Sequence, residues 1–324
     1  MNAWRLCIQR HTFGTRLHET PPARPKTHVQ MNRRDFIRIG SGAMASLSFE
    51  AVAAEREKLA GEVGVTTGSF VRHLAVAAQP GKLHLLDLPP IMRDELGMKV
   101  MDLMTATLAS MEPDYLDKLR AEADRAGCIL TNLKMNQKDL DMTSADPEVR
   151  KHALGEYKRT INAAARLGVR WVRPLPGPKR PDFAICAASY RELIDYAAPR
   201  GISLLIENYG WMQSDPDAIP AMIKAVGKGL DAQPDTGNWT NNDVRYTGLA
   251  RAFPLAVSCD FKARELALDG SHDAYDLARC FGIGWDAGFR GPWCLEHFHS
   301  DLGELYREMR LLRDQLRAWM KARQ

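Results

Sequence analysis

The chain has no CxxC pair and no GxGxxG motif after its first apolar strand-like run. Only six cysteines occur in 324 residues, and the five that follow the N-terminal region are widely spaced. Three of these five stand in apolar, strand-like runs, so we expect buried free thiols rather than disulfides or a zinc site. The most apolar N-terminal run, residues 39–49, is short and rich in glycine and serine. It therefore predicts no stable membrane insertion.

The formal charge of +4 is unevenly distributed along the chain. Residues 1–38 contain eight lysine or arginine residues and two acidic residues, which leaves the remainder of the chain at −2. A nucleic-acid-binding domain needs a basic stripe on its folded surface, and the body of this sequence has none. We therefore expect no nucleic-acid partner.

The segment MNRRDFIRIGSGAMASLSFEAVAAE contains the pair Arg33 and Arg34, then a weakly apolar run, then an Ala-Val-Ala sequence suited to cleavage. It resembles a twin-arginine export signal and predicts a signal peptide over residues 31–54, with the mature protein in the periplasm. An ordinary amphipathic N-terminal helix is the alternative. Residues 1–30 carry no periodic apolar pattern, which predicts a disordered leader or a mis-assigned start.

From about residue 60 onward, helix-like and strand-like segments alternate at the spacing of a βα unit. Glycine repeatedly ends a helix just before an apolar run, as Gly127 does in RAGCILTNL and Gly168 does in RLGVRWVRPL. Glycine suits this position because it adopts the left-handed conformation without a steric penalty. The pattern predicts eight strands, near residues 63–67, 98–103, 128–133, 169–175, 202–207, 230–235, 256–262 and 292–296.

Eight strands that are each followed by a helix predict an α/β fold of the (β/α)8 TIM barrel type over residues 60–324. A doubly wound open sheet is the alternative. The missing GxGxxG motif and the number of repeats favour the barrel.

The last four predicted strands each deliver a carboxylate. The run Leu204–Ile206 is apolar at successive positions, which is typical of a strand buried on both faces, and it leads to Glu207. The other three carboxylates are Asp235, Asp260 and Glu296. Four carboxylates at one barrel mouth repel each other and need protons or a cation. An all-oxygen ligand set favours Mn²⁺ or Mg²⁺ over zinc, whereas a single carboxylate of this kind is more often a helix cap or an arginine partner.

Four motifs, LLIENYG, QPDTGNW, AVSCDFK and WCLEHF, resemble the metal-bearing segments of the sugar phosphate isomerase/epimerase family, the xylose isomerase-like barrels. The resemblance implies one divalent ion held by Glu207, Asp235, Asp260 and Glu296. In ketose-converting members the two glutamates are also the acid/base pair. The resemblance therefore implies that Glu207 and Glu296 are catalytic. One would remove the proton next to a carbonyl through a metal-bound enediolate, and the other could return it with opposite configuration.

The chain departs from the family pattern at two positions. Asp260 stands where the family usually has histidine, and Asn238 stands where a second histidine would be expected. A fourth carboxylate makes the site more anionic, which should strengthen binding of a hard metal ion and weaken that ion as a Lewis acid. A sugar-binding barrel without turnover therefore stays open.

Five neighbouring residues are candidates for substrate binding, and each has a structural alternative. Lys262 could instead pair with Asp260, and Arg173 could pair within the carboxylate ring. Trp211 and Trp239 could simply pack in the fold, and His297 could interact with a helix N-terminus.

The sequence therefore predicts a metal-dependent isomerase or epimerase acting on a small-molecule carbohydrate or cyclitol. A keto-inositol dehydratase begins with the same proton abstraction and is an alternative, as is the sugar-binding barrel. An endonuclease acting at abasic sites is disfavoured, because that chemistry uses a histidine-rich multi-zinc site. The sequence does not determine the oligomeric state, and it is compatible with a homo-oligomer.

Overall fold

A computed structural model describes residues 58–324 except 78, 138, 176 and 178. The predicted leader and export signal lie outside the described residues. None of the helices within the described residues combines the length and apolarity needed to cross a membrane.

Eight parallel strands form a single sheet in the order β6-β5-β4-β3-β2-β1-β8-β7. Apart from β6 and β7, which stand at the two ends of this order, strands that are consecutive in sequence pair with each other. Strand β1 pairs with both β2 and β8. The strands are β1 (Val63–Thr66), β2 (Val100–Met104), β3 (Ile129–Met135), β4 (Trp171–Pro174), β5 (Ser203–Ile206), β6 (Leu230–Ala232), β7 (Cys259–Lys262) and β8 (Trp293–Glu296).

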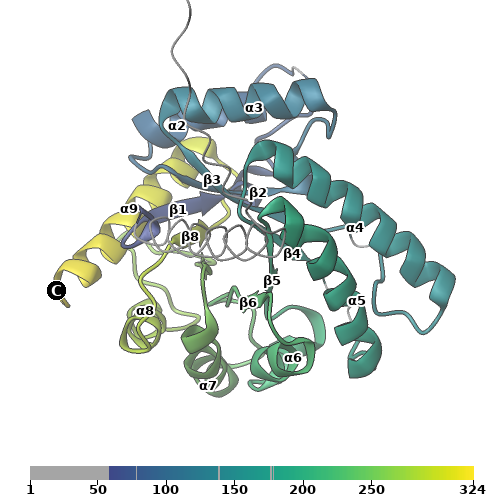
Figure 1. Ribbon diagram of the computed structural model, residues 1–324. Coiled ribbons are helices and arrows are strands. Elements are labelled where there is room, and N and C mark those ends of the chain that lie inside the picture. The colour runs from purple at the N-terminus through teal and green to yellow at the C-terminus, as the bar shows by residue number, and fades with distance from the viewer. Residues whose placement is uncertain (1–57, 78, 138, 176, 178) are drawn as a thin grey trace, which may run out of the picture. The chain divides into compact units, whose positions relative to one another are not determined.

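The two outer strands of this order, β6 and β7, meet through isolated parallel bridges. One bridge joins Ala232 to Ala256, and a second joins Asp235 to Asp260. These bridges close the curled sheet into a barrel (Figure 1). The predicted (β/α)8 fold is confirmed, and the doubly wound alternative is wrong.

Eight described α-helices surround the strands (Figure 1). Helix α4 (Pro147–Leu167) ends at Gly168, as the sequence predicts, with φ of 74° at this glycine. At its N-terminus, Asp146 accepts a hydrogen bond from the Glu148 amide. The helices are α2 (Leu88–Asp94), α3 (Pro113–Ala126), α4 (Pro147–Leu167), α5 (Phe183–Ala197), α6 (Ala218–Val226), α7 (Asn242–Ala252), α8 (Leu277–Asp286) and α9 (Leu302–Lys321).

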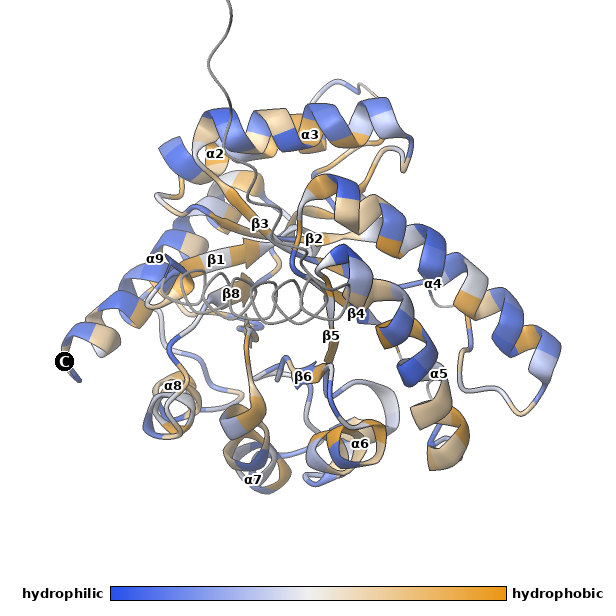
Figure 2. Ribbon diagram, viewed as in Figure 1, coloured by the Kyte–Doolittle hydropathy of each residue, from blue (hydrophilic) through white to orange (hydrophobic). Residues whose placement is uncertain are grey.

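Buried hydrophobic side chains pack against both faces of the sheet, which explains the unbroken apolar strands. The colouring in Figure 2 marks much of β1 and β3 as hydrophobic. Leu204 and Ile206 pack in the main core between strands and helices. Leu205 points the other way, into a smaller apolar cluster inside the barrel, because successive side chains of a strand alternate between its faces. The five described cysteines are buried free thiols, as predicted.

The smaller cluster forms an apolar layer that underlies the functional mouth. It contains one residue from each of four strands, Val100, Trp171, Leu205 and Cys294. Two positions further along each strand, the side chain points in the same direction. The residues at these positions are all polar, namely Asp102, Arg173, Glu207 and Glu296. The barrel interior therefore changes from an apolar layer to a charged layer toward the C-terminal ends of the strands.

Candidate active site

Three buried carboxylates converge at the C-terminal mouth of the barrel. Glu207 directly follows β5, Asp235 lies three residues after β6, and Asp260 lies within β7. One oxygen from each of the three lies within 4.8 Å of the others. The bridge between Asp235 and Asp260 brings two of these carboxylates side by side.

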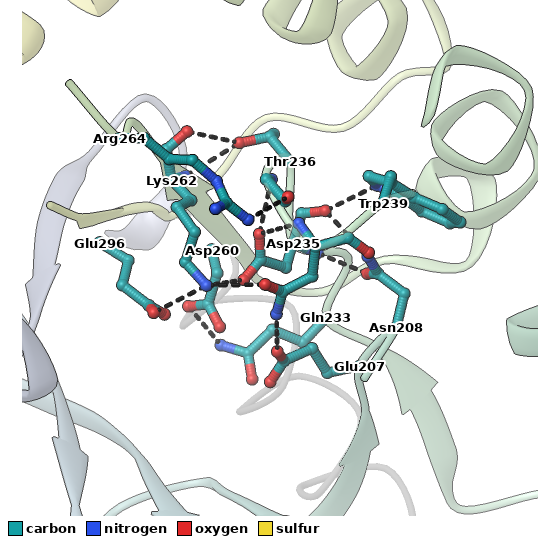
Figure 3. A network of polar contacts seen from close by, with 12 residues as sticks. Glu207, Asn208, Gln233, Asp235, Thr236, Trp239, Asp260, Lys262, Arg264 and Glu296 are labelled. Carbon is teal, nitrogen blue, oxygen red and sulfur yellow. Dashed lines mark hydrogen bonds and ion pairs between the residues drawn. The ribbon is translucent and has the colours of Figure 1, made fainter. Parts of the chain in front are cut away.

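Glu296, at the end of β8, is linked to this group through a lysine. The Nζ atom of Lys262 lies 2.7 Å from Asp235 Oδ2 and 2.8 Å from Glu296 Oε1. Figure 3 shows the Lys262 side chain reaching between these two carboxylates. Glu296 is not part of the compact three-carboxylate group, so its predicted role as a metal ligand stays a prediction.

The loop that carries Asp235 is fixed by a dense set of hydrogen bonds. The Oδ1 atom of Asp235 accepts from the amides of Gly237 and Asn238 at 2.6 and 3.0 Å. The side chain of Asn208 accepts from the Asp235 amide and donates to the carbonyls of Asp235 and Asn238. Trp239 Nε1 donates to the same Asp235 carbonyl at 2.8 Å. The carboxylate of Asp235 is therefore held in one orientation.

Glu207 is held between an arginine and an amide. Arg173 Nε lies 2.9 Å from Glu207 Oε2, and a second Arg173 nitrogen donates to Asn136 at 2.8 Å. On the other side, Asn238 Nδ2 donates to Glu207 Oε1 at 2.8 Å, while Asn238 Oδ1 accepts from Lys262 at 3.0 Å. The amide of Asn238 thus connects the carboxylate of Glu207 to the ammonium of Lys262.

A second lysine, Lys134 on β3, lies fully buried beside Asp260. Its Nζ atom donates to Asp260 Oδ1 and lies 4.0 Å from both Asp102 Oδ2 and Glu296 Oε2. Gln233 donates to Asp102 Oδ2 at 2.9 Å and completes the contacts on this side of the site.

The pKa values of the site follow from burial and from these ion pairs. Burial raises the pKa of Asp235 to about 6, although Lys262 partly offsets the effect. Burial likewise raises the pKa of Asp260 well above its ordinary value, against the opposing effect of Lys134. For Glu296, the charges of the two lysines outweigh burial and lower the pKa. Without a further positive charge, Asp235 and Asp260 therefore hold their protons more tightly than ordinary carboxyl groups do.

The donor set fits a hard divalent cation. Two buried oxygens, Asp260 Oδ2 and Glu207 Oε2, accept no hydrogen bond from any described residue. Of these two, Glu207 Oε2 lies in an ion pair, 2.9 Å from Arg173 Nε. When all groups are ionised, five carboxylates against three cations leave the site at a formal −2, which one divalent ion would neutralise. The carboxylates are Asp102, Glu207, Asp235, Asp260 and Glu296, and the cations are Lys134, Arg173 and Lys262.

Two predicted substrate-binding cations are engaged in ion pairs at the site. Arg173 pairs with Glu207, the structural alternative that the sequence left open. Lys262 pairs with Asp235 and Glu296, whereas the sequence alternative was a pair with Asp260. Both lie at the mouth, within reach of the same carboxylates that a substrate would approach.

The two tryptophans and the histidine that were predicted to bind substrate lie in different surroundings. Trp239 is buried and is held through its indole nitrogen by the Asp235 carbonyl. Trp211 is half-buried and lies edge-on against Phe183. His297 is buried, with its ring nitrogens 3.0 Å from the Ala263 carbonyl and 2.6 Å from Glu308 Oε2. These contacts place the imidazole of His297 on the helix side of β8, and its predicted contact with substrate stays untested.

The sequence interpretation did not include Lys134, Asp102 or Gln233 in the site. Each is a polar residue inside or just after an apolar strand, in the runs TNLKM, VMDLM and LDAQP. A charged side chain in a strand that is otherwise buried was the available signal. The role of such a side chain depends on which strand lies opposite, and this is determined only in the closed barrel.

Comparisons with known proteins agree with this architecture. A model of the xylose isomerase-like TIM barrel family matches residues 94–323. The chain therefore belongs to the xylose isomerase-like TIM barrel family. No curated protein sequence matches the chain significantly.

Several solved structures share the fold at low sequence identity. A xylose isomerase domain protein from Planctomyces limnophilus has 16% identity and a TM-score of 0.60, over 82% of this chain and 98% of that chain. A xylose isomerase-like TIM barrel protein from Mycobacterium smegmatis in complex with magnesium has 18% identity and a TM-score of 0.58, with the same coverage. D-psicose 3-epimerase with D-tagatose from Clostridium cellulolyticum H10 has 16% identity and a TM-score of 0.63, over 79% and 98%.

Proposed function

We propose that this protein is a divalent-metal-dependent isomerase or epimerase of a carbohydrate or cyclitol. The observation that carries the proposal is the group of three buried carboxylates, Glu207, Asp235 and Asp260, at the mouth of a barrel of this family. Active sites of TIM barrels lie at this end. The sugar epimerase and the magnesium-bound barrel among the similar structures support the proposal.

Glu207, Asp235 and Asp260 would hold the ion, and Glu296 would complete the set from β8. A bound Mn²⁺ or Mg²⁺ would polarise the substrate carbonyl and its neighbouring hydroxyl, and so acidify the C–H bond between them. The all-oxygen donor set is the reason for preferring these ions to zinc.

Proton transfer is assigned to the two glutamates. They come from β5 and β8, which are three positions apart in the ring of strands, so they approach a bound substrate from different sides. Against the effect of burial, Lys262 and Lys134 lower the pKa of Glu296, so this carboxylate is in the deprotonated form that a general base requires. Glu207 is the corresponding proton carrier on its side, and its Oε2 atom lies 2.9 Å from Arg173 Nε.

Lys262 and Arg173 would orient the substrate. Each already contacts one of the two glutamates, at 2.8 Å for Lys262 and Glu296 and at 2.9 Å for Arg173 and Glu207. A substrate hydroxyl that enters between them could accept a hydrogen bond from either cation. The same contacts would hold the glutamates in position before the substrate arrives.

The second candidate is a sugar-binding barrel without turnover. It is favoured by one observation, namely that Lys134 and Lys262 already pair with carboxylates of the site. A keto-inositol dehydratase shares the first proton abstraction and is a variant of the main proposal.

The test is a substrate panel run with purified protein whose metal content has been measured. Ketopentoses, ketohexoses and a keto-inositol are incubated with protein and Mn²⁺, and the products are separated by chromatography, with EDTA-treated protein as control. Conversion of a sugar to an isomer supports the proposal, and loss of water from the keto-inositol selects the dehydratase. If a sugar binds stoichiometrically and no compound in the panel is converted, the protein is a sugar-binding barrel without turnover.

A further inference from the structure

The two site lysines have different carboxylates as their nearest partners. Lys262 contacts Asp235 and Glu296, whereas Lys134 contacts Asp260. Arg173 is paired with Glu207. Among the described residues, Lys134 is therefore the cation that forms an ion pair with Asp260, and its side chain is fully buried.

The two oxygens of Asp260 have different surroundings as a result. Oδ1 accepts from Lys134 and lies 3.4 Å from Gln233 Nε2. Oδ2 is buried and accepts no hydrogen bond from any described residue. One oxygen is anchored, and the other is left for a ligand. A buried carboxylate oxygen without a partner is costly unless a cation completes its surroundings.

We propose that Lys134 is a positioning residue that serves as the built-in counter-ion of Asp260, so that the carboxylate binds a divalent ion while the pair as a whole adds no net charge. The inference rests on the proposed metal-dependent function. It accounts for an aspartate at the position where the sequence resemblance implies a neutral histidine, because an aspartate paired with a lysine is also neutral overall.

The geometry gives Lys134 a further effect on the site. Its ammonium lies 4.0 Å from Asp102 and from Glu296, so it lowers the negative potential of the whole carboxylate group. This charge should hold metal affinity below the value that the site would have without Lys134. Removing the lysine charge should therefore tighten metal binding and destabilise the metal-free protein at the same time.

The test uses full-length protein carrying Lys134→Gln, which removes the charge but keeps a hydrogen-bond donor toward Asp260. Calorimetric titration measures Mn²⁺ affinity, and thermal unfolding in EDTA measures stability. We expect Lys134→Gln to bind Mn²⁺ about tenfold or more tightly than the wild type, because one positive charge beside the ion is gone. Its melting temperature in EDTA should fall, and Mn²⁺ should raise it by more than it raises that of the wild type.

Asp260→Asn and the double variant Lys134→Gln/Asp260→Asn complete the cycle. In EDTA the double variant should lose less stability than the two single losses combined, because neither partner is then left as an unpaired buried charge. This comparison keeps the proposal testable if Lys134→Gln alone folds poorly. The matched control is Lys158→Gln, which breaks an exposed pair with Glu192 at 2.6 Å and should leave Mn²⁺ affinity unchanged.

The outcomes separate this inference from the proposed function. If the wild type binds Mn²⁺ and Lys134→Gln binds it no more tightly, the counter-ion role is wrong while the metal-dependent function stands. If the wild type binds no Mn²⁺ but Lys134→Gln does, Lys134 occupies the place of the ion, which overturns both. If no variant binds Mn²⁺, both also fail. Additive stability losses in the cycle would contradict the pairing itself.

Discussion

The ammonium of Lys262 lies 2.7 Å from the carboxylate of Asp235, on the neighbouring loop of the barrel mouth. The sequence suggested a pair between Lys262 and Asp260, which lie on the same face of β7. In the structure, Asp260 instead forms its ion pair with Lys134, which lies on β3. The cations of the site thus connect different strands, and they hold the carboxylates together against their mutual repulsion.

Glu207 and Glu296 are expected to carry protons as well as to face the metal ion. Changing either to glutamine keeps an oxygen for the ion but removes the group that accepts the substrate's proton. We expect turnover to fall by about 100-fold or more, while Mn²⁺ affinity falls by less than about tenfold. Steady-state kinetics and calorimetric Mn²⁺ titration on the same preparations check this. Equal losses in turnover and affinity would assign the glutamates to metal binding alone.

The raised pKa of Asp235 gives the stability of the metal-free protein a defined pH dependence. Its ordinary value of 3.8 becomes about 6 in the folded protein, so the folded state binds this proton more tightly than the unfolded state does. The resulting stability is fully present below about pH 4 and is lost as the pH rises through 6. Relative to Asp235→Asn, the wild type should lose on the order of 2 kcal/mol between pH 4 and 7.

Urea unfolding in EDTA at several pH values measures this difference. In the presence of Mn²⁺, the stability of the wild type should instead rise with pH over this range, because the ion competes with the proton for Asp235. The affinity for Mn²⁺ should therefore fall below about pH 6. A stability difference that stays constant with pH would mean that the pKa of Asp235 is ordinary.

Gly248 in α7 is expected to support the site through Trp239. A Cβ atom at position 248 would overlap the Trp239 indole, and that indole donates to the Asp235 carbonyl at 2.8 Å. Gly248→Ala should therefore weaken Mn²⁺ binding and lower the free energy of unfolding by about 1–3 kcal/mol. The matched control is Gly155→Ala in α4, where no described atom apart from the chain neighbours and the adjacent helix backbone lies within 4 Å of the added Cβ.

Gly155→Ala should instead stabilise the protein by roughly 0.5–1 kcal/mol, since alanine is the better helix former. Urea unfolding and Mn²⁺ titration of both variants make the comparison. Equal Mn²⁺ affinities in the two alanine variants would show that Trp239 does not position Asp235.

We propose that export depends on the arginine pair of the N-terminal segment, because its apolar run is too weakly hydrophobic for the general secretory route. Arg33 and Arg34 are both changed to lysine, and cells are fractionated. The variant should remain in the cytoplasm while the wild type reaches the periplasm. A normal amount of processed variant in the periplasm would contradict the signal assignment.

Much of the fold could be predicted because its signals are local. Helix-ending glycines and unbroken apolar strands mark each βα unit, and the predicted strands match the observed ones within a few residues. Periodicity also explains Glu207, which points inward because Leu205, two positions earlier, packs inside the barrel. The carboxylates that end the last strands could be found for the same reason.

The pairing of charges could not be predicted, because it depends on strands far apart in the sequence. Lys134 and Asp260 are 126 positions apart, and they meet only because β3 and β7 share one closed ring. The same applies to Asp102 and Gln233, which are 131 positions apart. A sequence pattern identifies which residues are buried and charged, but the register of the closed barrel decides which of them neutralise one another.

The most direct test of the proposed function is exchange of a substrate hydrogen with solvent. Wild-type protein loaded with Mn²⁺ is incubated in deuterated water with each member of the ketose and keto-inositol panel, and the sugars are examined by NMR. The proposal predicts deuterium at the carbon next to the carbonyl of at least one compound, with no label in EDTA. Of Glu207→Gln and Glu296→Gln, the variant that lacks the abstracting glutamate should also give no label. Absence of label in every compound, with Mn²⁺ bound, would contradict proton-abstraction chemistry.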